Sequence, residues 1–87
     1  LALEPASAEA LHNIGHVLDV GLDQPERGLG YLARALEVAP HDDEIAASYA
    51  LALARAGRRA EARALLEERF ASEDPDALLE RWLGSIA

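Results

Sequence analysis

A bulky residue followed by a tiny one, with an apolar residue three positions further on, recurs at a nearly constant interval along this chain. The three occurrences are Ile14-Gly15 with Leu18, Tyr49-Ala50 with Leu53, and Leu83-Gly84 with Ala87, and they start 35 and 34 residues apart. A period in this range is typical of helix-turn-helix units that stack on one another, because one unit cannot bury its own apolar face. We expect the tiny residues Gly15, Ala50 and Gly84 to lie where a second helix crosses closely.

The composition also favours helices. The chain has 87 residues, 51% of them hydrophobic, and most of these are Ala and Leu rather than β-branched or aromatic residues. A chain of this length makes one small domain. The absence of Cys excludes disulfides, thiolate zinc sites and cysteine nucleophiles. All eight basic residues are Arg, which we interpret as the coding bias of a GC-rich, bacterial genome.

Apolar periodicity predicts five helices, at about 8–20, 25–39, 43–56, 59–71 and from 75 to the end of the chain. Residues that can accept hydrogen bonds from free backbone N–H groups precede three of them: Ser7, Asp42 or Asp43, and Asp74. Gly21 is expected to end the first helix in the left-handed conformation, and Gly57 to end the third helix. No segment alternates with period two, so we expect no strands.

The small and large positions recur in order through both units. The first unit supplies Leu11, Ile14, Gly15, Leu18, Gly28, Leu32, Ala35 and Pro40. The second supplies Ala46, Tyr49, Ala50, Leu53, Gly57, Ala62 and Leu66. Over nearly the whole chain this pattern resembles the tetratricopeptide repeat family, whose unit has about 34 residues. The resemblance implies an all-α fold, a right-handed superhelical solenoid of antiparallel helix pairs.

The resemblance divides the chain into the tail of a preceding repeat (1–7), a first repeat (8–42), a second repeat (43–76) and a capping helix or first helix of a third repeat (77–87). Residues 1–5 match residues 36–40 at a step of 35, so we interpret the chain as a piece of a longer array. Some positions depart from the family pattern. The first repeat has one extra residue near 22–25, Arg69 replaces a small residue, and Pro75 displaces the closing proline.

For function, the resemblance implies a protein–protein interaction or scaffold module rather than an enzyme. The first helix of each pair would line a concave groove that binds a partner segment. The groove positions hold Glu9, His12, His16 and Asp19 in the first repeat, and Glu44, Ala47, Leu51 and Arg55 in the second. Some family members clamp a terminal carboxylate with Lys, Asn and Arg. Those positions hold His12, His16, Glu44 and Ser48 here, and the chain has no Lys, so acidic chaperone tails are disfavoured as partners.

Four polar residues of the first helix also have spacings that place them on one face. Glu9, His12, His16 and Asp19 follow one another at steps of 3, 4 and 3. Two His at this spacing can share a zinc ion with a carboxylate as third ligand. The catalytic His-Glu-x-x-His motif is absent, however, because Asn13 follows His12. We therefore expect a solvated polar face without a bound metal or other cofactor.

Two charged segments have simple structural interpretations. The acidic residues 42–44 after His41 are expected to cap a helix, with a weak cation site as the alternative. Arg55, Arg58, Arg59 and Arg63 alternate with Glu and are expected to form exposed ion pairs, with an anionic docking patch as the alternative. The sequence contains neither a nucleophile elbow nor a phosphate-binding glycine loop, and we predict no enzymatic activity.

The last helix carries a broad apolar band, formed by Leu78, Leu79, Trp82, Leu83 and Ile86. This band is wider than one neighbouring helix pair should cover. We expect an exposed edge at Leu78, Trp82 and Ile86 through which the chain could self-associate.

The charge and hydropathy limit the classes of partner. A net charge of −8 disfavours nucleic acid, whose binding requires a basic face. No apolar run approaches the roughly 20 residues that a membrane helix needs. The partner's identity stays open, as does the compartment, with the cytoplasm slightly favoured. Two alternatives to a partner-binding module remain: a self-association module, and a substrate-positioning segment of a larger enzyme.

Overall fold

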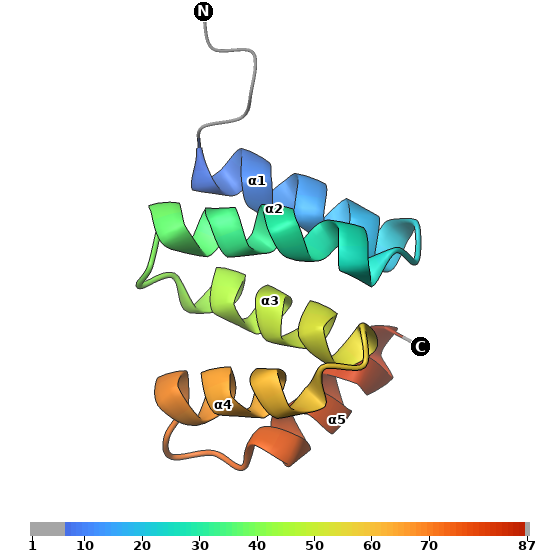
Figure 1. Ribbon diagram of the computed structural model, residues 1–87. Helices are drawn as coiled ribbons and strands as arrows, with labels where there is room; N and C mark the ends of the chain where they lie inside the picture. Colours follow the sequence, from blue (N-terminus) through green and yellow to red (C-terminus); the bar gives the residue numbers. More distant parts are fainter. Residues whose placement is uncertain (1–6, 87) are drawn as a thin grey trace, which may run out of the picture.

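Residues 7–86 are described in the structure, a computed structural model, and they form a stack of helices. The elements are α1 (Ala8–His16), its π-helical continuation η1 (Val17–Gly21), α2 (Pro25–Val38), α3 (Asp43–Arg55), α4 (Arg59–Arg69) and α5 (Pro75–Ile86). Each helix reverses the direction of the one before it, from α1 at one end of the stack to α4, and α5 packs against both α3 and α4 (Figure 1). No described residue lies in a strand, so the prediction of an all-α fold with five helices is confirmed.

Local side-chain caps fix where three helices begin. The Ser7 hydroxyl accepts a hydrogen bond from the N–H of Ala10 at 3.0 Å. The Asp42 carboxylate accepts from the second and third residues of α3 at 3.0 and 3.2 Å. Asp74 accepts from the second residue of α5 at 3.0 Å. These bonds satisfy backbone donors that have no partner within the helix. All three predicted caps are therefore confirmed, with Asp42 rather than Asp43 capping α3.

Helices α1 and α2 cross where two glycines meet. A Cβ on Gly15 would lie 2.6 Å from Cγ of Leu32, and one on Gly28 would lie 2.6 Å from the carbonyl oxygen of Gly15. The prediction of a close crossing at Gly15 is thus confirmed. Ala50, at the corresponding place in α3, is fully buried. The prediction is wrong for Gly84, which has open space around it, because no helix follows α5 within residues 7–86.

The turn after α1 takes up the extra residue of the first unit. The N–H of Leu22 donates to the carbonyl of Val17 at 2.9 Å, a span of five residues, which is wider than an α-helical turn. This π turn carries Gly21 within the helix, and Asp23 takes the left-handed conformation instead, with φ 54°. The prediction of a left-handed Gly21 is therefore wrong. Gly57 follows the end of α3 as expected, and it has φ +83°.

The buried side chains form two clusters. The larger one joins α2 to α5 and comprises Leu29, Leu32, Ala50, Ala52, Leu53, Ala62, Leu66, Leu78 and Leu79. The smaller one comprises Leu11, Ala35 and Ile45 and joins α1, α2 and α3. Because α5 begins at Pro75, the expected boundary between 76 and 77 falls inside this helix. Within residues 7–86, no helix combines the length and apolarity that crossing a membrane requires.

Candidate functional site

Two polar contacts join α1 and η1 to α3. Nε2 of His12 lies 2.7 Å from the Ser48 hydroxyl, and Nε of Arg55 donates to the carboxylate of Asp19 at 2.8 Å. Both contacts join residues that are 36 positions apart. An equal offset at two places means that the two helices run in the same direction, side by side. The first helices of the two units therefore form one continuous surface.

We name this surface the α1–α3 face. It is defined by the six predicted groove residues that keep solvent exposure, namely Glu9, His12, His16, Glu44, Ala47 and Arg55. Glu9, His16 and Glu44 are exposed, and the other three are half-buried. The remaining two predicted groove residues, Asp19 and Leu51, are buried. These two side chains are therefore not available to a partner, and Asp19 is held against α3 by Arg55.

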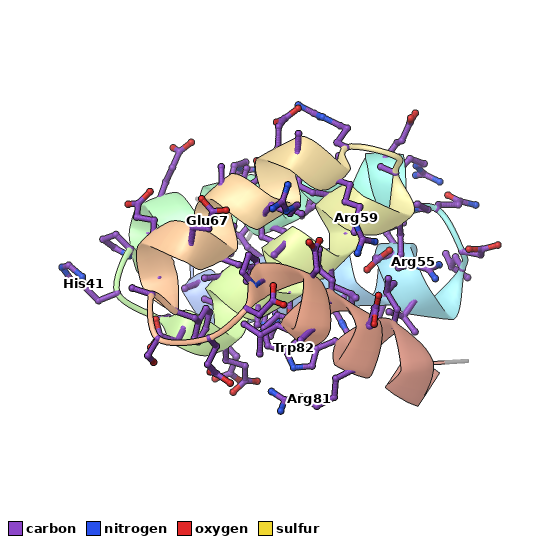
Figure 2. The ribbon with its side chains drawn as sticks, turned by 90° about the horizontal axis from the view of Figure 1, so that it is seen from below. His41, Arg55, Arg59, Glu67, Arg81 and Trp82 are labelled. Carbon is purple, nitrogen blue, oxygen red and sulfur yellow. The ribbon has the colours of Figure 1, made fainter. Side chains whose placement is uncertain are left out.

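Asp19 is the only charged or polar residue among the buried side chains of the described chain. It is 1% exposed, and one of its carboxylate oxygens has no hydrogen-bond partner among the described residues. Arg55 also donates to the backbone carbonyl of Asp19 at 3.1 Å and to the Asp23 carboxylate at 2.6 Å. Figure 2 shows Arg55 at the same end of the helices as Arg59 and opposite to His41. One guanidinium group thus ties the turn after η1 to the end of α3.

These contacts also affect the ionisation of Arg55. The hydrogen bond with Asp19 raises the pKa of Arg55 above its usual value, against the opposing effect of burial, and the negative charges of Asp19 and Asp23 act in the same direction. The expectation of an exposed ion pair is therefore wrong for Arg55, whose partner is a buried carboxylate. In the sequence, Arg55 follows Asp19 by 36 positions, which is the same separation as that between His12 and Ser48.

His12 and His16 contribute two imidazole rings to the α1–α3 face. The ring centroids of His12 and His16 are 6.1 Å apart, and His12 is also held by Ser48. Among the described residues, no three His, Asp or Glu side chains are placed to hold one metal ion. An imidazole can donate or accept a hydrogen bond, so the exposed His16 can bond a partner's backbone or side chain. The contact of Ser48 with His12 does not follow from the sequence, in which Ser48 only stands at the position of a family clamp residue.

The remaining arginines of the cluster form surface ion pairs. Arg58 binds the Glu61 carboxylate through two nitrogens, each at 2.8 Å. Arg59 and Arg63 both lie 3.3 Å from the carboxylate of Asp76 and so connect α4 to α5. All five side chains are at least two-fifths exposed. The prediction of exposed ion pairs is confirmed for these three arginines.

The expected association edge on α5 is largely covered. Leu78 is 3% exposed and lies in the main core, because the single helix pair α3–α4 is enough to cover it. Leu78 is therefore not part of an accessible edge. Trp82, which Figure 2 labels on α5, is half-buried and meets Phe70 edge-to-face, with ring centroids 6.0 Å apart. The side chain of Ile86 is outside the described residues.

Comparisons of this chain with protein-family models, with curated proteins and with solved structures give no match. The two units can, however, be compared with each other. The capping residues Ser7 and Asp42 are 35 residues apart, as are the small buried residues Gly15 and Ala50. The first two residues each cap the first helix of a unit, and the other two are each buried in that helix.

Proposed function

We propose that this chain is a protein–protein interaction module of the tetratricopeptide-repeat type that binds a segment of a partner protein on the α1–α3 face. The observation that carries the proposal is the pair of contacts, His12 with Ser48 and Asp19 with Arg55, that share one offset. They support a two-helix surface on which α1 and α3 run parallel and are held together at two places. Side chains held on a rigid scaffold suit the recognition of a peptide segment.

The side chains of the face indicate the chemistry of the partner. Glu9 and Glu44 present exposed carboxylates, and His16 presents an exposed imidazole. Ala47 lies one turn after Glu44 with a small side chain, which allows a partner backbone to approach. The chain carries a net charge of −8, which attracts cationic segments over a distance. We therefore expect a peptide with Lys or Arg side chains rather than an acidic one.

A displayed peptide library selected on the purified chain tests the proposal. Peptides enriched on the parent are then measured against two alanine-to-arginine variants. Ala47→Arg adds bulk and positive charge to the α1–α3 face, whereas Ala64→Arg makes the same change at an exposed position of α4. We expect enriched peptides to carry net positive charge, and to lose at least tenfold in affinity on Ala47→Arg, about 1.4 kcal/mol, but little on Ala64→Arg.

Melting curves of both variants establish that each remains folded. Equal losses on the two variants would place the binding elsewhere on the molecule. Selection that enriches no peptide above background would oppose an interaction function for this face.

A further inference from the structure

A small hollow on α2 is bordered by Arg27, Gly30, Tyr31 and Arg34, and it has a volume of about 190 Å³. Residues three, four and seven positions apart lie on one side of a helix, so these four residues share one side of α2. Arg27, Gly30 and Arg34 are exposed, while Tyr31 is half-buried against the smaller core cluster. This side of α2 is therefore open, although the helix packs against both α1 and α3 (Figure 1). We name the site formed by these four residues the α2 arginine hollow.

Packing among the described residues gives no reason for a glycine at position 30. Gly28, two positions earlier, is required where α2 crosses α1, because a Cβ there would lie 2.6 Å from the carbonyl oxygen of Gly15. A Cβ on Gly30 would have open space around it. Glycine inside a helix is less stable than alanine, so folding alone favours a side chain here. Gly30 lies midway between Arg27 and Arg34, and its missing side chain leaves room for a ligand to approach the helix backbone.

The two arginines give the hollow a positive charge. Arg27 donates to the side-chain oxygen of Gln24 at 2.6 Å, and this neutral acceptor leaves the positive charge of the guanidinium in place. The backbones of Arg27 and Arg34 are about 10 Å apart along the helix axis, a gap that two long side chains can close around an anion. Each guanidinium can bond two oxygens of one anion at once. Among the described residues that border the hollow, none carries a negative charge.

We propose that the α2 arginine hollow binds a phosphorylated side chain of a partner protein, with one arginine on either side of the phosphate group. A phosphate monoester carries a charge of about −1.5 to −2 at neutral pH and has three acceptor oxygens, which is enough for two guanidinium groups. A carboxylate has one negative charge and two oxygens, which suit a single arginine. The volume of about 190 Å³ is below the roughly 300–1,000 Å³ of sites that enclose a whole small molecule, and it suits one side chain.

Other anionic partners suit the hollow less well. Nucleic acids and anionic membranes present many negative charges over a wide area, and the chain's net charge of −8 repels such surfaces. A second copy of the chain could offer only carboxylates, and it carries the same net charge. A single compact phosphate group meets the two arginines with the least additional negative charge. No residue of the hollow belongs to the α1–α3 face, so this inference is independent of the function proposed above.

The test selects a peptide library with a fixed central phosphoserine on the purified chain. The tightest phosphopeptide is then compared with the same peptide carrying Ser or Glu at its centre. We expect both replacements to weaken binding about tenfold or more, because hydrogen bonds between charged groups are the strong ones. Arg27→Gln and Arg34→Gln should each have an effect of that size. Arg59→Gln, which removes the same charge from an exposed position of α4, should weaken binding less than about twofold.

Gly30→Leu tests the hollow without removing a charge. Leucine is a good helix former, so the variant should stay folded, and its side chain should fill the hollow and weaken the phosphopeptide about tenfold or more. Gly84→Leu is the matched control, because Gly84 is also exposed in a helix with open space around it, and it should leave binding unchanged. Melting curves establish that both variants are folded.

Three results would overturn the proposal: selection that enriches no phosphopeptide, equal binding of the peptide with Glu, and equal losses on Gly30→Leu and Gly84→Leu. Inorganic phosphate that displaces the phosphopeptide at equal concentration would assign the hollow to a free anion and would also overturn it.

Discussion

Asp19 and Arg55, which are 36 residues apart in the sequence, form an ion pair at 2.8 Å in which the carboxylate is almost completely buried. A buried pair of this kind often adds little net stability over apolar residues of the same size, because both ions lose their hydration. Removing one partner is costly, however, because it leaves the other charge buried and unpaired. The pair therefore constrains how α1 can lie on α3, and with it the shape of the α1–α3 face.

The first prediction follows from this asymmetry. Arg55→Ala should lower the free energy of unfolding by about 3 kcal/mol, since it strands the buried carboxylate of Asp19. The matched control is Arg58→Ala, which removes the exposed pair with Glu61 and should change the stability very little. Urea denaturation measures both. In a double-mutant cycle, Asp19→Leu with Arg55→Leu should cost clearly less than the sum of the single changes. Additive losses would mean that the two residues do not act as a pair.

The second prediction concerns pH. Because the pKa of Arg55 is raised on folding, its contribution is fully present below its unfolded pKa and is lost only as the pH rises through the still higher folded pKa. That range is far above neutrality. The charge of Arg55 should therefore stay constant between about pH 6 and about pH 9. The difference in urea midpoint between the parent and Arg55→Ala should therefore not shrink as the pH rises through this range. A difference that disappears toward about pH 9 would be inconsistent with this assignment.

The third prediction compares two glycines in helices. Gly15→Ala should destabilise the chain by about 1–3 kcal/mol, because the new methyl group would lie 2.6 Å from Leu32 in a filled core. Gly30→Ala should stabilise it by about 0.5–1 kcal/mol, because Gly30 has open space and Ala is the better helix former. Thermal melts decide the sign of each change. If both changes raised the melting temperature, the close crossing at Gly15 would be refuted.

The fourth prediction concerns the contact between His12 and Ser48. Ser48→Ala should cost about 1 kcal/mol, the usual net value of one hydrogen bond. Ser72→Ala, at an exposed position in the turn before α5, should cost less than about 0.5 kcal/mol. Chemical denaturation of the two variants gives the comparison. Equal values would show that the hydroxyl of Ser48 adds nothing to the packing of α1 on α3.

The fifth prediction separates folding from association at α5. Trp82→Ala should lower the free energy of unfolding by about 2 kcal/mol, because the indole is partly buried and meets Phe70. The mass measured by sedimentation should be the same before and after the change. A variant that keeps the parent's stability but loses a dimer would instead return Trp82 to the association edge expected from the sequence.

Features that depend on local interactions could be predicted from the sequence. The caps at Ser7, Asp42 and Asp74 and the left-handed Gly57 follow from the preferences of single residues. The close crossing at Gly15 followed from the repeat spacing. The sequence predicts the wrong left-handed residue in the first turn, because an extra residue can be accommodated at several positions. The π turn keeps Gly21 helical, and Asp23 takes the left-handed conformation instead.

The candidate site was less accessible to sequence reasoning, because burial depends on the helix that lies beside a residue. The spacing predicts that Asp19 lies on the same side of the helix as His12 and His16. It does not predict that a second helix covers Asp19. From the sequence we expect Leu78 at an exposed edge, on the assumption that one helix pair covers α5 only in part. The structure has both α3 and α4 against α5, and their combined cover buries Leu78.

The most direct test of the proposed function is a titration of the isotopically labelled chain with the tightest peptide from the library, followed by amide chemical shifts. Binding on the α1–α3 face predicts that the largest changes occur at His12, His16 and Ala47, and that the exposed side of α4 around Ala64 changes little. It also predicts that Ala47→Arg removes these changes. Shifts confined to α4, or to Ile14 and Val17 on the other side of α1, would contradict the account.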